Sequence, residues 1–175
     1  MSPMQEDPTL ATWRSLGERL AGSFAARARG LLASDFSILD REGDEVGRLR
    51  IHGSEGAELE AGVLQARIER LARSRYRMLS GGTEILTAGS AGASSTLEIR
   101  CLDRRYEARL SLLRNTAEAA RGGDVAVRIT GGLTNRRYEA TFDEDDEGSL
   151  PVAFFLLYRI NSLRREAYRA GPKGS

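Results

Sequence analysis

The feature that most restricts the fold of this chain is a continuous apolar run near its C-terminus. Residues 150–158 read LPVAFFLLY, so a helix formed here is apolar on every side. Ser149 is a natural N-cap, Pro151 suits a first turn, and the acidic run 143–147 lies where the helix dipole favours negative charge. The apolar run has about half of the ~20 residues that a membrane span requires. The sequence therefore predicts a helix over residues 149–169 that is buried inside the protein.

Most of the chain before this helix alternates apolar and polar side chains with a period of two. This period is typical of β-strands with one buried face. Turns rich in glycine, asparagine and aspartate divide the alternating segments into hairpins. We expect hairpins over residues 36–51, 76–88, 97–110 and 125–142. Residues 57–72 fit either a strand or a helix pattern, and the strands on both sides favour the strand.

The sequence Arg-Arg-Tyr-Glu-Ala occurs twice, at residues 104–108 and 136–140. Each copy follows a turn and begins the return strand of a predicted hairpin. The alternation places Tyr106 and Tyr138 on the buried face, and the glutamate after each tyrosine in water. The segment between the two hairpins, residues 115–124, reads as a connecting loop or a short helix. The repeat thus indicates one kind of hairpin built twice, with paired arginines beside each turn.

The N-terminal part of the chain has the pattern of an amphipathic helix over residues 9–33. Residues 1–8, acidic and rich in proline, are expected to be disordered. Tryptophan, phenylalanine and arginine in this pattern also suit a helix that lies on a membrane. Gly17 and Gly22 weaken an isolated helix, which favours docking on the same domain over lying on a membrane. Docking on a partner chain is an equally open alternative. The apolar stripe comprises Leu10, Trp13, Leu16, Leu20, Phe24 and Leu31.

The order of these elements predicts a mainly β (α+β) protein. A helix, a meander of about nine to twelve strands and a final apolar helix indicate a closed antiparallel barrel with that helix in its core. Residues 35–170 would form this single domain, with residues 149–169 as the core helix and 171–175 as a tail. A pleckstrin-like domain is the alternative fold, but its capping helix would be apolar on one side only.

The composition limits the chemistry that this chain can perform. Its 175 residues are 41% hydrophobic and carry a net charge of +1, so bulk charge draws it neither to nucleic acid nor to a membrane. Cys101 is the only cysteine and His52 the only histidine, which excludes an intrachain disulfide and a CxxC metal site. We expect no cofactor and no metal. The acidic run 143–147 fails the calcium-loop pattern, because Phe154 stands where a bidentate glutamate is required.

The order of elements resembles the tubby-like superfamily, which includes the LURP-one-related proteins and the phospholipid scramblases. FSILDREGDEVGRLR, residues 36–50, looks like the family's strand, Asp-x-x-Gly turn and Val-Gly strand. YRMLSGGTEILTAG, residues 76–89, is similar to the next hairpin, and LPVAFFLLYRI, residues 150–160, resembles the terminal helix. The resemblance spans residues 35–169 and implies a closed barrel around a hydrophobic helix. It also implies binding of phosphoinositide headgroups or of membranes.

Arginines on two predicted strands are the candidate ligand site. The segment RSRYRML places three of them on one strand face, and the segment GRLR places two on another. If these strands adjoin, five guanidiniums would converge and hold phosphate or carboxylate groups. The arginines of the repeat would form a second patch if the two turns lie side by side. The alternative is a solvated barrel exterior. The candidate anion-binding residues are Arg48, Arg50, Arg73, Arg75, Arg77, Arg136 and Arg137.

The leading hypothesis is a non-catalytic barrel that serves as an interaction or membrane-surface module. Its partner would be an anionic phospholipid surface or a protein, and not a nucleic acid, because the few aromatic residues (6%) are assigned to the core. The absence of a signal-peptide pattern and a composition typical of a GC-rich genome favour a bacterial cytoplasm, at the membrane periphery. The alternatives are a carrier with an apolar ligand inside the barrel and an enzyme that uses carboxylates alone.

Overall fold

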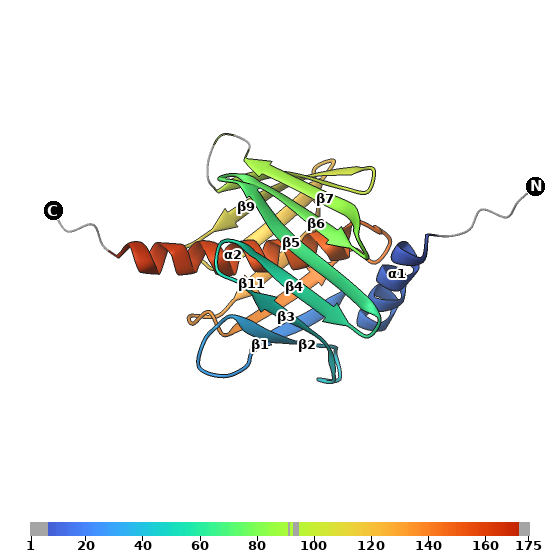
Figure 1. The fold of residues 1–175 in the computed structure, drawn as a ribbon, viewed down its shortest axis with the longest axis horizontal. Helices are drawn as coiled ribbons and strands as arrows, with labels where there is room; N and C mark the ends of the chain where they lie inside the picture. Colours follow the sequence, from blue (N-terminus) through green and yellow to red (C-terminus); the bar gives the residue numbers. More distant parts are fainter. Residues whose placement is uncertain (1–6, 91, 93–94, 172–175) are drawn as a thin grey trace, which may run out of the picture.

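The computed structural model describes residues 7–90, 92 and 95–171, and this part of the chain forms two helices and twelve strands (Figure 1). Residues 1–8, expected to be disordered, lie almost wholly outside the described residues. The elements are α1 (Pro8–Leu20), β1 (Ser23–Ala28), β2 (Asp35–Leu39), β3 (Glu45–Ile51), β4 (Gly56–Ala61), β5 (Leu64–Ala72), β6 (Arg75–Ser80), β7 (Thr83–Ser90), β8 (Thr96–Cys101), β9 (Arg104–Ser111), β10 (Thr116–Arg121), β11 (Asp124–Gly131), β12 (Arg137–Phe142) and α2 (Ser149–Ala170).

The strands follow one another round a closed barrel in chain order, and β1 completes the ring between β2 and β12. Phe24 of β1 pairs with Ala140 of β12, and Ala26 pairs with Ile38 of β2. Every neighbouring pair is antiparallel, so successive turns alternate between the two ends of the barrel. The predicted closed antiparallel meander barrel is confirmed, as is the strand assignment for residues 57–72.

The strand that closes the barrel comes from the segment predicted as an N-terminal helix. The prediction of a helix over residues 9–33 is wrong beyond Leu20, and a strand begins at Ser23. Ala21 adopts a left-handed backbone with φ of 53°, and its N–H donates to the carbonyl of Gly17. Without β1, both β2 and β12 would expose an unpaired edge. The pairing of these edges therefore outweighs the helix propensity of an alanine-rich segment.

A second correction concerns residues 115–124, which were expected to form a loop or a short helix. Thr116–Arg121 form β10 instead, with the small side chains of Ala117 and Ala119 buried. Alanine has a low strand propensity, so the sequence gives little sign of this strand. A bulge in the pairing of β10 with β11 turns Val125 toward solvent, although the alternation predicts it to be buried. Helix α2 packs against β10, β11 and β12, and the small alanine side chains of β10 leave room for it.

Helix α2 runs along the inside of the barrel and is buried on all sides over residues 149–162 (Figure 1). The ring of Phe154 stacks on Phe24 of β1 with 4.6 Å between centroids. Phe155 meets Tyr76 of β6 edge to face, with 5.7 Å between centroids. The predicted helix over residues 149–169 and its place in the core are confirmed. Its aromatic contacts reach opposite sides of the ring, which explains why it is apolar all round.

The start of α2 differs from the expectation in one respect. Gly148, and not Ser149, is the N-cap, so the predicted role of Ser149 is wrong. The Ser149 hydroxyl donates to the carbonyl oxygens of Asp143 and Asp146, which fixes the chain as it turns into the barrel. A Cβ atom on Gly148 would overlap the hydroxyl of Tyr106. The close approach of this tyrosine therefore requires a glycine before the helix.

Helix α1 covers the end of the barrel where α2 begins (Figure 1). Trp13 Nε1 donates to Ser80 Oγ at 2.9 Å, and its ring lies 6.1 Å from that of Phe154. The helix begins with a side-chain cap, in which Asp7 accepts the N–H of Thr9 at 2.9 Å. The amphipathic helix thus docks on its own barrel, as favoured from the sequence.

Candidate functional site

The alternation of strand directions sorts the loops between two ends of the barrel (Figure 1). The closed end carries α1, the start of α2 and the turns before β3, β5, β7, β9 and β11. The open end is where α2 leaves the barrel, among the other turns. The closed end comprises residues 7–22, 40–44, 62–63, 81–82, 102–103, 122–123 and 143–148. The open end comprises residues 29–34, 52–55, 73–74, 92, 95, 112–115, 132–136 and 163–171.

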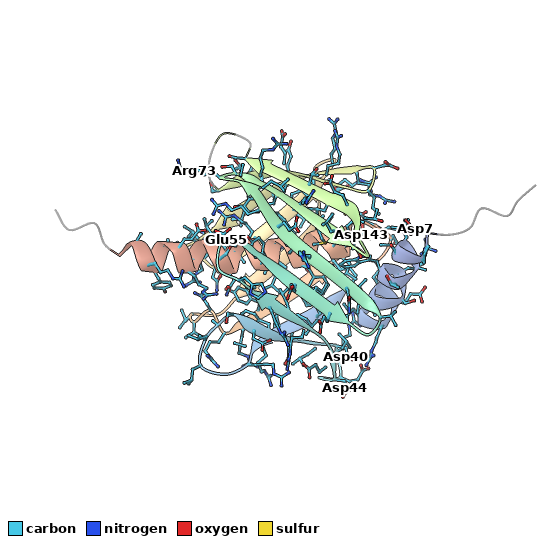
Figure 2. The ribbon with its side chains drawn as sticks, in the orientation of Figure 1. Asp7, Asp40, Asp44, Glu55, Arg73 and Asp143 are labelled. Atoms are coloured by element: carbon cyan, nitrogen blue, oxygen red, sulfur yellow. The ribbon has the colours of Figure 1, made fainter. Side chains whose placement is uncertain are left out.

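The two ends carry opposite charge. The described residues of the closed end include eleven aspartates or glutamates and three arginines, a net charge of −8. Figure 2 shows Asp7, Asp40, Asp44 and Asp143 toward this end and Arg73 toward the other side. The open end includes two glutamates and seven arginines, a net charge of +5. These arginines are Arg29, Arg73, Arg114, Arg136, Arg164, Arg165 and Arg169.

The two strands predicted to share an arginine site are not neighbours. Arg48 and Arg50 lie on β3, whereas Arg75 and Arg77 lie on β6, with β4 and β5 between them. The expected convergence of five guanidiniums does not occur, because β4 presents glutamates to the solvent in that interval. Arg48 and Arg77 each contact a carboxylate of the preceding strand, at 3.5 and 2.8 Å. Carboxylates on the outer wall of the barrel therefore neutralise two of the five predicted arginines.

The paired arginines of the repeat stand at opposite ends of the barrel. Three pairing steps separate β9 from β12, so the two strands run in opposite directions. Arg104 and Arg105 begin β9 at the closed end, whereas Arg136 and Arg137 lie at the start of β12 at the open end. The hypothesis of a joint patch is wrong for this reason. The tyrosine of each copy is buried and the following glutamate is exposed, as predicted.

Arg136 holds two parts of the open end together. Its guanidinium donates to the carbonyl of Gly30 at 2.6 Å and to that of Leu31 at 3.2 Å. These bonds join the turn before β12 to the loop before β2. Arg137 is exposed and pairs in register with Arg27 of β1, so two like charges face each other. Of the predicted pair, Arg136 has a structural role and Arg137 faces the solvent.

Much of the positive charge at the open end lacks a carboxylate partner. Within the described part of the chain, Arg73, Arg114 and Arg169 have no salt bridge. Glu166, one of the two acids at this end, lies 3.9 Å from a guanidinium nitrogen of Arg70. The arginines that face the solvent are therefore available to an external anion.

Only part of this group was predicted from the sequence. Arg73 and Arg136 were among the predicted residues, whereas Arg29, Arg114 and the arginines beyond residue 163 were not. The sequence does contain a signal for this grouping. Every second turn of an antiparallel meander lies at the same end of the barrel, so counting the strands shows which charged turns lie together. The unrecognised strands β1 and β10 made that count wrong.

The closed end contains a charge network built on the buried carboxylate of Asp146. Tyr106 Oη donates to both carboxylate oxygens at 2.8 Å, and the N–H of Gly148 donates to one of them at 3.1 Å. Arg104 Nε lies 3.1 Å and Arg121 Nη1 3.7 Å from the same carboxylate. Burial, and then the hydrogen bond to Asp146, raise the pKa of Tyr106 above its ordinary value. The tyrosine therefore stays a neutral donor that ties the start of α2 to the barrel wall.

The only cysteine and the only histidine lie far apart. Cys101 is buried at the closed end of β8, where burial and the Asp146 carboxylate raise its pKa to about 12. The thiol is therefore protonated at neutral pH. His52 is exposed at the open end, with Nε2 3.4 Å from Glu58 Oε2. The two side chains do not form a nucleophile and base pair.

A hollow of about 760 Å³ lies on the outer wall over β7, β8 and β9. It brings Arg75 together with Arg105, an arginine of the repeat, and with Arg100, which was not predicted as a site residue from the sequence. Arg100 faces Arg105 across the strand pair, and Glu98 faces Glu107 in the same way. The hollow thus combines three positive charges with two negative ones. Its excess of positive charge is smaller than that of the open end.

Two further properties bear on what the barrel can bind. No group of three or more His, Cys, Asp or Glu side chains among the described residues is arranged to hold a metal ion. Neither α1 nor α2, over the residues described, is long and apolar enough to cross a membrane as a helix.

The fold defines a class of protein, a meander barrel built around its own C-terminal helix. The crystal structure of protein AT5G01750 from Arabidopsis thaliana is similar to this chain, with a TM-score of 0.55 and 9% sequence identity. The similarity covers 87% of this chain and 96% of the Arabidopsis chain. At this level of identity it concerns the fold alone. The sequence matches no protein-family model and no curated protein.

Proposed function

We propose that this chain is a non-catalytic, tubby-like barrel that binds anionic membrane surfaces through its open end, as a peripheral protein of the cytoplasm. The observation that carries the proposal is the separation of charge, +5 at the open end against −8 at the closed end. An anionic surface attracts the positively charged open end and repels the negatively charged closed end. The barrel would therefore stand on the membrane with α1 directed away from it.

The chemistry of the open end suits lipid headgroups. A guanidinium forms two parallel hydrogen bonds with a phosphate or a carboxylate. Arg73, Arg114 and Arg169 have no internal salt bridge in the described structure, so no ion pair must break before they bind. A basic residue beside an anionic bilayer contributes about 1 kcal/mol, so these three supply roughly 3 kcal/mol, or about a hundredfold in affinity.

The alternative of a carrier with a ligand inside the barrel receives less support. The side chains of α2 occupy the interior from residue 149 to residue 162, and they pack against both β1 and β6. A ligand would have to displace this helix from the core. The open end, in contrast, needs no rearrangement to meet a headgroup.

Vesicle co-sedimentation of the full chain tests the proposal. The wild-type protein should pellet with phosphatidylcholine vesicles that contain phosphatidylserine and stay in solution with pure phosphatidylcholine. Added salt should reduce the binding, because the attraction is between exposed charges. A variant with Arg73→Ala, Arg114→Ala and Arg169→Ala should bind about a hundredfold more weakly.

The matched control removes three arginines from the other half of the barrel. Arg19 lies on α1, and Arg100 and Arg105 lie in the wall hollow near the closed end. Their joint replacement by alanine changes the net charge by the same amount and should leave vesicle binding near the wild-type level. The proposal fails if the wild type pellets equally with both vesicle compositions or with neither. It also fails if the control variant loses as much binding as the open-end variant.

A further inference from the structure

Exposed leucines gather at the same end of the barrel as the unpaired arginines. Leu31, Leu113 and Leu133 are each at least 96% exposed, and they lie at the tips of the turns before β2, β10 and β12. Leu32 and Leu112 lie beside two of them. We call residues 29–34, 112–115 and 132–136 the leucine turns. The turns of the closed end carry mainly glycine and acidic residues, with Val63 as their exposed apolar side chain, so the cluster of several apolar tips is a property of the open end.

The three leucine turns are neighbours around the ring. The strand order at this point is β2, β1, β12, β11, β10 and β9, and every second connection in it lies at the open end. The loop before β2, the turn before β12 and the turn before β10 therefore follow one another without an intervening turn. Leucines from distant parts of the sequence form one arc of the rim.

Hydrogen bonds hold the leucine turns to one another. Arg136, in the turn 132–136, donates to the carbonyls of Gly30 and Leu31 and so joins this turn to the loop 29–34. Asn115, which is buried, donates from Nδ2 to the carbonyl of Gly132 at 3.0 Å and accepts the N–H of Gly131 at its own carbonyl at 2.8 Å. A Cβ on Gly131 would overlap the Asn115 side chain, so the contact is specific to glycine. The apolar tips are thus held in fixed positions by a polar support.

We infer that the leucine turns insert into the interfacial region of an anionic bilayer. The inference rests on the proposed function. It adds how deeply the protein enters the bilayer and which residues contact the lipid. Arg29 and Arg114 belong to the same turns as the leucines, so they would lie at the headgroup phosphates when the tips reach the acyl boundary. Arg114 has no salt bridge to the residues that the structure describes, whereas Arg29 makes an exposed contact of 3.2 Å with Glu45 that a phosphate would replace. Tips that project separately from their own protein fit between headgroups. A second copy docking by the same end would bring two faces of charge +5 together.

Site-specific fluorescence measures the insertion directly. Leu113→Cys places a thiol on a leucine tip, and Val63→Cys places one on an apolar residue of the closed end that is 87% exposed. Cys101 is buried and its pKa is raised to about 12, so a thiol-reactive NBD dye should leave it unlabelled. With vesicles of phosphatidylcholine and phosphatidylserine, the dye at residue 113 should brighten severalfold and shift to the blue. The dye at residue 63 should not change.

A binding measurement with the same vesicles tests the energetic part. Leu113→Ala combined with Leu133→Ala should weaken binding by about tenfold for each leucine that reaches the acyl region. The salt dependence should stay as in the wild type, because the arginines are intact. Val63→Ala is the matched control and should bind like the wild type.

The outcomes separate this inference from the proposed function. Absence of wild-type binding to vesicles with phosphatidylserine overturns both. Salt-sensitive wild-type binding with a silent dye at residue 113 and an unaffected leucine variant overturns insertion and leaves electrostatic binding in place. A lipid-free dimer in analytical ultracentrifugation that Leu113→Ala and Leu133→Ala convert to monomers would assign the leucine turns to a second copy, and it also overturns insertion.

Discussion

The two copies of Arg-Arg-Tyr-Glu-Ala lie at opposite ends of the barrel, so the same five residues can be compared in two environments. At the closed end, Tyr106 donates to the charged Asp146, which two arginines also contact. At the open end, the Tyr138 hydroxyl forms its hydrogen bonds with neutral amides. It donates to Asn135 Oδ1 at 3.4 Å and accepts from Asn161 Nδ2 at 3.4 Å. The same five residues therefore have a charged partner at one end and uncharged partners at the other.

The repeated sequence therefore determines that a strand forms and which of its side chains are buried. The position of each copy in the meander determines at which end of the barrel its arginines lie. At the closed end the first arginine of the repeat, Arg104, is neutralised by an internal carboxylate. The open end has few carboxylates, and its arginines differ in their partners. Arg29 lies 3.2 Å from Glu45, Arg136 bonds to carbonyl groups, and Arg73 faces the solvent without a salt bridge to any described residue. The closed end is held together by ion pairs to a buried carboxylate, whereas the open end leaves part of its positive charge exposed to the solvent.

The largest effect on stability is expected from Asp146→Ala at the closed end. The change leaves the buried Tyr106 hydroxyl and the Arg104 guanidinium without their acceptor, and it should lower the free energy of unfolding by about 3 kcal/mol. Asn161→Ala removes a long, neutral hydrogen bond at the open end and should cost about 1 kcal/mol. Urea unfolding followed by the fluorescence of Trp13 measures both. Equal losses would contradict the comparison of the two ends.

A substitution of glycine tests the packing at the start of α2. A Cβ in Gly148→Ala would overlap the Tyr106 hydroxyl, so tyrosine or helix must move, and the free energy of unfolding should fall by about 2 kcal/mol. Gly132→Ala at the open end is the control, because its nearest contact would be an ordinary 3.8 Å. We expect a change there of less than about 0.5 kcal/mol in the same urea titration. A tolerated Gly148→Ala would show that the closed end is loosely packed.

Alkaline pH should also act at the closed end. In the folded protein the pKa of Cys101 is raised to about 12, against an ordinary value of 9.0. The unfolded chain then loses the thiol proton first, so the stabilising contribution is complete below pH 9 and declines as the pH rises toward 12. By pH 10 the loss should be about 1 kcal/mol from this group alone. Cys101→Ala should show a smaller decline between pH 8 and 10 in urea unfolding, and an identical decline would refute this assignment.

The smallest of these effects concerns the arginine pair at the open end. Arg136→Ala loses two hydrogen bonds to the loop before β2 and should cost about 1 kcal/mol of unfolding free energy. Arg137→Ala removes an exposed charge that faces Arg27 and should change stability by less than about 0.5 kcal/mol. Thermal unfolding of the two variants resolves the difference. Similar losses from both would indicate that the pair acts as one unit.

The core of the fold was predictable because its patterns are strong. Residues 36–51 and 76–88 alternate clearly around glycine turns, and the run 150–158 is apolar on every side of a helix. The segments of β1 and β10 were not recognised, since alanine supplies much of their buried face and favours helices in isolation. Their strand conformation arises from edges that need a partner, which is a property of the closed ring.

The candidate site was less predictable than the fold, and for a related reason. Arg73 and Arg136 were named from the sequence, but the grouping of charge by barrel end depends on the number of strands between turns. Omitting β10 reverses the direction of β12 relative to β9 and brings the two arginine pairs to the same end. The Asp146 network was hidden within an acidic run whose members look alike in sequence, although only this carboxylate is buried.

Hydrogen exchange of the full chain, free and bound to vesicles of phosphatidylcholine and phosphatidylserine, tests the assignment of the open end as the membrane-binding face. We predict slower amide exchange on binding in residues 29–34, 112–115 and 132–136. We predict unchanged exchange in the closed-end segments 40–44 and 143–148. Slower exchange confined to the closed end, or to the outer wall of β3 and β6, would contradict this assignment.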